Sequence, residues 1–217
     1  MDRNLESGEV GAEPTARRFV EKLETYRSPE EAKKRQRYVK AGEGEYGEGH
    51  EFMGVRMGRV FWLAEEFIGM PPEEIEKLLE SPIHGVRAGG LSIMDKQARS
   101  KRTPETRRKE LFDLYLRRTD KINNWDLVDV GAPYVVGGYL FDKSRDVLYE
   151  LARSECVWER RTAIVSTAYF IRQGDVADTF EIAGMLLEDD QDLIHKATGV
   201  VARGWQEGPS KAAELPR

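Results

Sequence analysis

The chain has 217 residues, of which 40% are hydrophobic and 34% are charged. This length suits one large domain or two small ones, and this composition is typical of a soluble, helix-rich protein rather than a disordered one. No segment approaches the roughly 20 apolar residues that a membrane-spanning helix needs. The polar, acidic residues 1–13 also lack the apolar core of a signal peptide. We therefore expect an intracellular protein without a membrane partner.

Cys156 is the only cysteine. A single thiol excludes an internal disulfide and a multi-thiolate metal site, and we expect Cys156 to be a small core residue. His50, His84 and His195 lie far apart in the sequence, and none shows the paired helical spacing of a zinc site. We therefore predict structural roles for the histidines, with no metal and no cofactor.

Charge is distributed unevenly along the chain, whose net charge is −5. Residues 85–121 contain eleven Lys and Arg against five Asp and Glu, a local charge of +6. Residues 173–193 contain seven acids and no bases, a local charge of −7. Phosphates respond to charge within about 10 Å, so the basic segment could bind nucleic acid despite the negative total. Alternatively, both segments are solvated outer faces of helices.

In chain order, residues 1–14 are predicted to form a flexible lead, and helical character begins near Thr15. The Gly-rich residues 42–49 are not a phosphate-binding loop of the Walker type, because no Gly-Lys-Ser/Thr follows them. Proline and glycine breaks then separate helix-length segments. The predicted helices span residues 57–68, 72–80, 83–99, 104–119, 123–140, 144–153, 156–173, 176–188 and 190–203.

Helical pairs of about 35 to 45 residues predict an all-α fold, an α-solenoid of stacked helical repeats with a concave face that would fit a duplex. Residues 15–203 are expected to form this single domain. Residues 204–217 are expected to form an irregular tail, because Gly204, Gly208 and Pro209 break helices.

The segment Asn123-Asn124-Trp125-Asp126-Leu127-Val128-Asp129 is the most informative stretch of the chain. On a helix, Trp125, Val128 and Asp129 share one face, because residues i, i+3 and i+4 are neighbours. An indole beside a carboxylate, with several cations nearby, can hold a cationic or phosphate-bearing ligand. The same pattern also fits an ordinary helix start with a buried tryptophan.

A second segment, residues 157–164, contains the adjacent Arg160 and Arg161. Neighbouring helical residues point about 100° apart, so only one of the two arginines can bind a given phosphate bidentately. Trp158, Ala163 and Ile164 are expected to pack. A surface arginine pair is the alternative.

Five motifs together resemble the DNA alkylation repair family, the AlkD-type alkylpurine DNA glycosylases with HEAT-like repeats. Their order and spacing match over roughly residues 35–199. The motifs are Tyr46-Gly47-Glu48-Gly49, Phe52-Met53-Gly54-Val55-Arg56, Trp125-Asp126-Leu127-Val128-Asp129, Trp158-Glu159-Arg160-Arg161 and His195-Lys196-Ala197-Thr198-Gly199.

The resemblance implies hydrolysis of the N-glycosidic bond of N3- and N7-alkylated purines in duplex DNA. It places Trp125 against the deoxyribose, makes Asp129 the catalytic carboxylate, and sets Arg161 on a phosphate beside the lesion. Arg160 and Lys196, from the matched motifs, complete the expected DNA contacts. It further implies a cytoplasmic protein, associated with the nucleoid in a prokaryote.

The chain departs from the family after Gly199. Val200 replaces a tryptophan that forms the second aromatic wall of the family's site, and the following residues differ from the family's next repeat. One hypothesis is that this tail is the family's C-terminal repeat in a shifted reading frame. Without that repeat we expect lower stability, much reduced glycosylase activity and exposure of apolar side chains on the last helices. Those side chains are Leu186, Leu187, Leu193 and Ile194.

Two other functions remain open from the residues. The chain could be a noncatalytic helical-repeat module that binds DNA. It could also be a protein-binding α-solenoid in which the tryptophan and arginine motifs serve packing and the surface.

Overall fold

The computed structural model describes residues 13–38 and 51–206, with residue 35 and residues 200–206 as backbone only. The predicted all-α fold is confirmed for these residues, in which the one extended pairing is an isolated bridge between Glu51 and Ile83. The helices are α1 (Ala16–Glu24), α2 (Pro29–Tyr38), α3 (Met57–Glu66), α4 (Pro72–Leu79), α5 (His84–Arg99), α6 (Glu105–Arg117), α7 (Trp125–Gly131), the π-helical η1 (Ala132–Gly137), α8 (Gly138–Leu140), α9 (Asp146–Ala152), α10 (Val157–Arg172), α11 (Ala177–Met185) and α12 (Asp192–Gln206).

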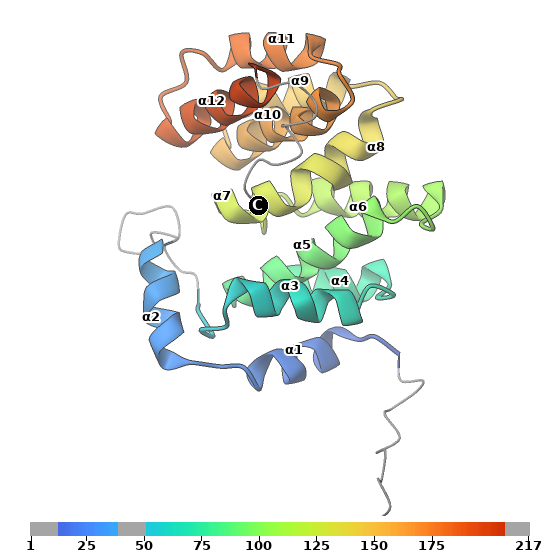
Figure 1. The fold of residues 1–217 in the computed structure, drawn as a ribbon, viewed down its shortest axis with the longest axis vertical. Coiled ribbons are helices and arrows are strands. Elements are labelled where there is room, and N and C mark those ends of the chain that lie inside the picture. The colour runs from blue at the N-terminus through green and yellow to red at the C-terminus, as the bar shows by residue number, and fades with distance from the viewer. Residues whose placement is uncertain (1–12, 39–50, 207–217) are drawn as a thin grey trace, which may run out of the picture.

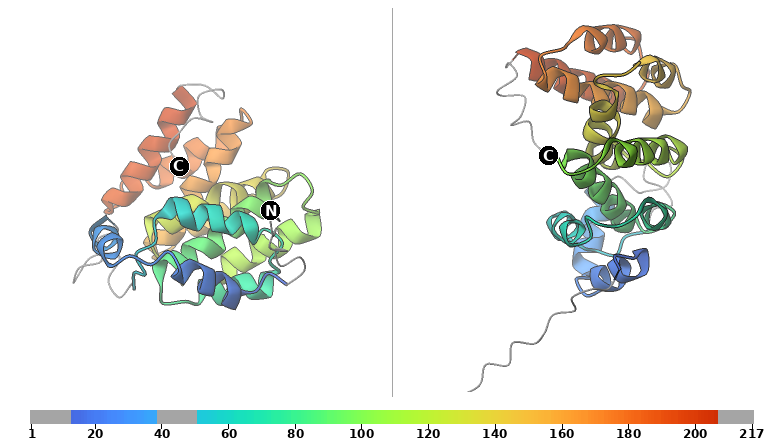
Figure 2. Two further views of the ribbon diagram at one scale, coloured as in Figure 1. Left: turned by 60° about the horizontal axis from the view of Figure 1, so that its bottom comes forward. Right: turned by 90° about the vertical axis from the view of Figure 1, so that its right-hand side faces the viewer.

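The helices stack in chain order into a two-layered solenoid (Figure 1). One layer runs through α3, α5, the continuous α7–η1–α8 and α10 to α12, and the other contains α4, α6, α9 and α11. Two further views show the same progression from the N-terminal to the C-terminal end (Figure 2). A solenoid of this kind brings equivalent ends of successive helices together along one edge.

Local signals explain where several helices begin. Thr15 caps α1, and its hydroxyl accepts a hydrogen bond from the backbone N–H of Arg18 at 3.4 Å. Pro72 occupies the first turn of α4, followed by Glu73 and Glu74, which favour the positive end of the helix dipole.

The predicted helix over residues 123–140 is one continuous helical segment with a π-helical turn in its middle. Pro133 lies in that turn. Because proline has no N–H and its ring crowds the preceding turn, a wider turn accommodates it without ending the helix. Tyr134, Val135 and Val136, which are residue types common in strands, therefore lie within a helix.

The core is a continuous set of buried apolar side chains that runs through both layers. Ala163 and Ile164 are fully buried, as predicted, and Trp158 packs against the core from a partly exposed position. Tyr115, the largest fully buried side chain, hydrogen-bonds through its hydroxyl to Thr162 Oγ1 at 3.1 Å and so links α6 to α10.

Three expectations are wrong. The last helix does not end before Gly204 but continues to Gln206, because a single glycine lowers helix stability without ending a helix. Cys156 is exposed, since it occupies the cap position before α10 rather than a packed helical face. Leu186 and Ile194 are buried against neighbouring helices, and of the predicted set only Leu187, with 69% of its surface accessible, is strongly exposed.

Candidate functional site

The candidate site lies at the start of α7, where Asn124 is the cap residue and Trp125 is the first helical residue. Trp125 is half-buried, and Asp129 follows one helical turn later with its side chain 39% exposed. The predicted pair therefore lies on one helix face, with the carboxylate open to solvent on one side.

Tyr38, the last residue of α2, packs its ring edge-on against Trp125, with 5.4 Å between ring centroids and 62° between planes. Tyr38 itself is largely exposed. No sequence pattern pairs these two aromatic residues, because 87 positions separate them. The contact brings α2, which stands beside the stack in Figure 1, next to the candidate site.

Asp129 and Arg161 form a bidentate ion pair between α7 and α10. The guanidinium Nε and Nη2 donate to the two carboxylate oxygens at 3.0 and 2.9 Å, and Nη1 donates to the backbone carbonyl of Leu193 at 2.7 Å. Arg161 is buried, so its three nitrogens are committed to these partners. Arg161 thereby fixes the orientation of Asp129, and the phosphate contact predicted for it stays a prediction.

Two opposing effects act on the Asp129 carboxyl. Burial among protein atoms raises its pKa, and the charge and hydrogen bonds of Arg161 lower it; nearby Asp126 raises it further. Burial is the larger effect, so the pKa lies above its ordinary value. Asp129 is thus a carboxylate that is held in place but incompletely solvated.

The two other predicted DNA contacts, Arg160 and Lys196, lie in different environments. Arg160 is tied to the fold: it donates to both oxygens of Asp189, at 2.6 and 3.2 Å, and to the carbonyls of Ser154 and Glu155. Lys196 is exposed on α12 and forms an ion pair with Asp192 one turn earlier at 2.5 Å. Lys196 is therefore available to solvent, whereas Arg160 joins α10 to the loop after α11.

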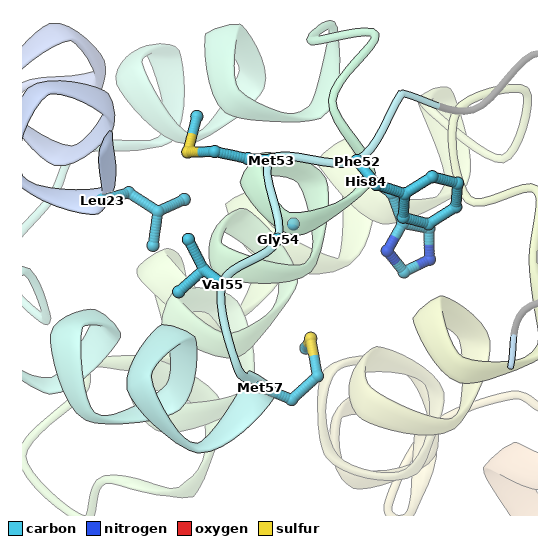
Figure 3. A pocket seen from close by; sticks show the side chains of 8 residues that line it. Leu23, Phe52, Met53, Gly54, Val55, Met57 and His84 are labelled. Atoms are coloured by element: carbon cyan, nitrogen blue, oxygen red, sulfur yellow. The ribbon is translucent and has the colours of Figure 1, made fainter. Parts of the chain in front are cut away.

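The buried side chain of His84 contacts the start of α7. His84 Nε2 lies 3.0 Å from Asp126 Oδ1, and Phe52 stacks on the imidazole with 5.5 Å between centroids. Figure 3 shows the rings of Phe52 and His84 lying across one another beside a small hollow. Mainly apolar residues line this hollow: Leu23, Phe52, Met53, Gly54, Val55, Met57, His84 and Gly85. His84 thus has the structural role predicted for it, directly beneath the site.

The basic segment 85–121 presents less free positive charge than its sequence suggests. Seven of its bases form ion pairs with acids, several of them outside the segment, and Arg87 and Arg108 donate to backbone carbonyls. The paired bases are Lys96, Arg99, Arg107, Lys109, Arg117, Arg118 and Lys121. Much of the segment therefore agrees with the alternative interpretation, in which its charged side chains lie on solvated outer faces of helices and form ion pairs there.

Further exposed cations lie on α2, whose last residue, Tyr38, contacts Trp125. Lys33 and Arg37 are exposed, and neither forms an ion pair within the described ranges 13–38 and 51–206. None of the α2 side chains described is buried. The run Lys33-Lys34-Arg35-Gln36-Arg37 could have signalled this surface, but only the Tyr38–Trp125 contact shows that it adjoins the site.

None of the described helices is long and apolar enough to cross a membrane. Within the same residues, no three side chains of His, Cys, Asp or Glu gather in a group that could hold a metal ion.

A family model for DNA alkylation repair enzymes matches residues 19–204. A solved structure described as a predicted DNA alkylation repair enzyme from Enterococcus faecalis has a TM-score of 0.63 and 18% sequence identity, over 87% of this chain and 88% of that one. At this identity, the likeness concerns the fold. No curated protein matches the chain. Since the family model spans the solenoid from α1 to α12, the chain belongs to the DNA alkylation repair enzyme family.

Proposed function

We propose that the protein is a DNA glycosylase that hydrolyses the N-glycosidic bond of N3- and N7-alkylated purines in duplex DNA. The observation that carries the proposal is the geometry of Asp129. Arg161 holds the carboxylate by two hydrogen bonds, yet 39% of the side chain stays exposed, one turn from the half-buried indole of Trp125. A ligand can therefore approach a carboxylate whose direction is already set.

This geometry suits the chemistry of a cationic lesion. A purine alkylated at N3 or N7 carries a formal positive charge and is a good leaving group, so its departure requires no strong general acid. As the bond breaks, positive charge develops on the deoxyribose. The Asp129 carboxylate would stabilise that charge and orient the attacking water. The indole face of Trp125 would add a cation–π attraction of about 1–2 kcal/mol where water is excluded.

Phosphate contacts would come from cations around the pair. Lys33 and Arg37 are exposed on α2, whose last residue Tyr38 contacts Trp125, and Lys196 is exposed on α12. We assign these three side chains to the DNA backbone, because exposed cations gain most from releasing the counterions of a phosphate. Arg161 would reach a phosphate only by giving up one of its present partners, so we propose that it orients Asp129.

Release of 7-methylguanine from alkylated duplex DNA tests the proposal. The unaltered protein is expected to release the base, at a reduced rate because position 200 is a valine where the family that the motifs resemble has a tryptophan. Asp129→Asn keeps an oxygen acceptor for Arg161 and removes the charge; it is expected to lower the single-turnover rate by about 100-fold. Asp142→Asn, which removes an exposed acid beyond the opposite end of the α7–η1–α8 segment, is the matched control.

Circular dichroism and duplex affinity show whether Asp129→Asn stays folded and still binds. An Asp129→Asn variant that is folded and fully active contradicts the assigned mechanism. Salt-dependent duplex binding without base release by the unaltered protein would instead indicate a noncatalytic DNA-binding module. Absence of both would indicate a protein-binding solenoid.

A further inference from the structure

Two residues of α5 contact the chain on either side of Trp125. His84, the first residue of α5, lies 3.0 Å from Asp126 through its Nε2 atom. Arg87, one turn later, donates from Nη2 to Asn123 Oδ1 at 3.4 Å. Asp126 follows Trp125 directly and Asn123 precedes it by two positions, so the two contacts bracket the tryptophan.

Both α5 residues are themselves held firmly. His84 is fully buried, and Phe52 stacks on its ring. Arg87 is also buried, and its Nη1 donates to the carbonyls of Ser81 and Pro82 at 2.7 and 3.1 Å. Because charged and polar groups are rarely buried without a partner, these contacts determine how the start of α7 sits on α5.

The start of α7 lacks the usual local means of fixing its position. No side chain caps the helix at Asn124, and α7 has only seven residues before the π-helical turn. A short helix without a cap is held mainly by tertiary contacts. The direction of the Trp125 side chain therefore depends on the tertiary contacts made by the residues on either side of it.

We propose that His84 and Arg87 form an α5 clamp, a pair of positioning residues that fixes Trp125 and, one turn later, Asp129 in the geometry required for base release. The catalytic part of this inference rests on the proposed function. Neither clamp residue touches the substrate, and both act through Asp126 and Asn123. Small misplacements of a catalytic group can cost about 100-fold in rate, so the clamp is expected to affect the chemical step more than DNA affinity.

Substitutions at His84 test the clamp. His84→Leu removes the donor to Asp126, whereas His84→Gln keeps a side-chain N–H donor of similar reach. Gln97→Leu is the matched control, because Gln97 lies on the same helix, is buried, and donates to the Met70 carbonyl at 2.7 Å away from the site. Gln97→Leu therefore also removes a buried hydrogen bond of α5, but leaves the start of α7 untouched.

Two measurements are made on each variant. Single-turnover base release and duplex affinity separate the chemical step from binding, and amide hydrogen exchange of residues 123–131, followed by mass spectrometry, reports the order of α7 independently of activity. His84→Leu is expected to lower the rate about 10- to 100-fold with an affinity change under about threefold. It should also exchange residues 123–131 at least about tenfold faster, while His84→Gln largely restores both.

The clamp is overturned if His84→Leu exchanges residues 123–131 no faster than Gln97→Leu, or if its rate loss is matched by an equal loss of affinity. If the unaltered protein releases no base, the proposed function fails, but the exchange comparison still decides whether His84 fixes α7.

Discussion

Asp129 lies where burial and ion pairing act against each other. Burial raises the pKa of its carboxyl group, Arg161 lowers it, and burial is the larger effect. The exposed part of the side chain is the part that a ligand can reach, whereas the two oxygens already accept hydrogen bonds from Arg161. The residue is thus suited to stabilise charge that develops nearby rather than to bind a cation beforehand.

Base release is expected to depend on pH through this raised pKa. The carboxylate is the active form, so the rate should rise with pH, with a midpoint above the ordinary Asp value of 3.8. The stability of the fold changes with pH in the opposite direction. Because the pKa is raised, the folded protein binds the Asp129 proton more tightly than the unfolded chain does, so this contribution to the free energy of unfolding is present at low pH and is lost as pH rises through the raised pKa. Single-turnover rates against pH and a carbon NMR titration of Asp129 check both. A midpoint at or below 3.8 would contradict the burial argument.

At the scale of elements, the crossing of η1 and α10 brings two backbones close together. Gly137 lies in η1, and a Cβ atom at this position would overlap the backbone carbonyl oxygen of Ser166 on α10. This crossing carries the α7–η1–α8 segment against α10, the helix that supplies Arg161. The ion pair with Asp129 therefore depends on a close helix contact that only glycine permits.

Gly137→Ala is expected to lower the free energy of unfolding by about 1–3 kcal/mol, because one of the two helices must move to relieve the overlap. Gly184→Ala is the control, since a Cβ atom there meets nothing within 4 Å; alanine should leave stability unchanged or raise it by up to about 1 kcal/mol. Urea unfolding followed by circular dichroism measures both. Equal stability of the two variants would show that the crossing is not tight.

On the scale of the whole molecule, the C-terminal part of the solenoid is acidic, whereas α2 carries exposed cations. α2 presents Lys33 and Arg37 at the N-terminal end, next to the candidate site, and residues 173–193 contain seven acids at the other end. Arg145 and Arg160 neutralise part of this acidic segment through Asp175, Asp178 and Asp189. A polyanion is therefore attracted to the α2 side and repelled from α11.

Replacing Lys33 and Arg37 together by glutamine should weaken duplex binding and reduce its salt dependence. The slope of log affinity against log salt should fall by roughly 2, because each phosphate contact contributes about 0.9. Lys101 and Arg102 serve as the charge-matched control. They follow the end of α5 opposite His84, about 24 Å away along a 16-residue helix at 1.5 Å per residue. An equal loss in the control would show that α2 provides no specific contact surface.

Much of the fold could be predicted from the sequence. Proline and glycine breaks separated helix-length segments that match α3 to α12 to within a few residues, because such signals are local to each helix. The ordered motifs predicted the DNA alkylation repair family, which the family model confirms. The residues proposed for catalysis, Trp125 and Asp129, also came from a local pattern, since four positions on one helix determine a shared face.

The partners of those residues were decided only by the tertiary structure. Asp129 meets Arg161 across 32 positions, Trp125 meets Tyr38 across 87, and His84 meets Asp126 across 42. Likewise, Leu186 and Leu187 are equally apolar, yet only Leu187 is exposed, because the packing of α11 against its neighbours selects one side of the helix. The sequence by itself determined the helices and the family. The stacking of the helices, which no local pattern encodes, decided which charged side chains pair within the protein and which stay exposed to a ligand.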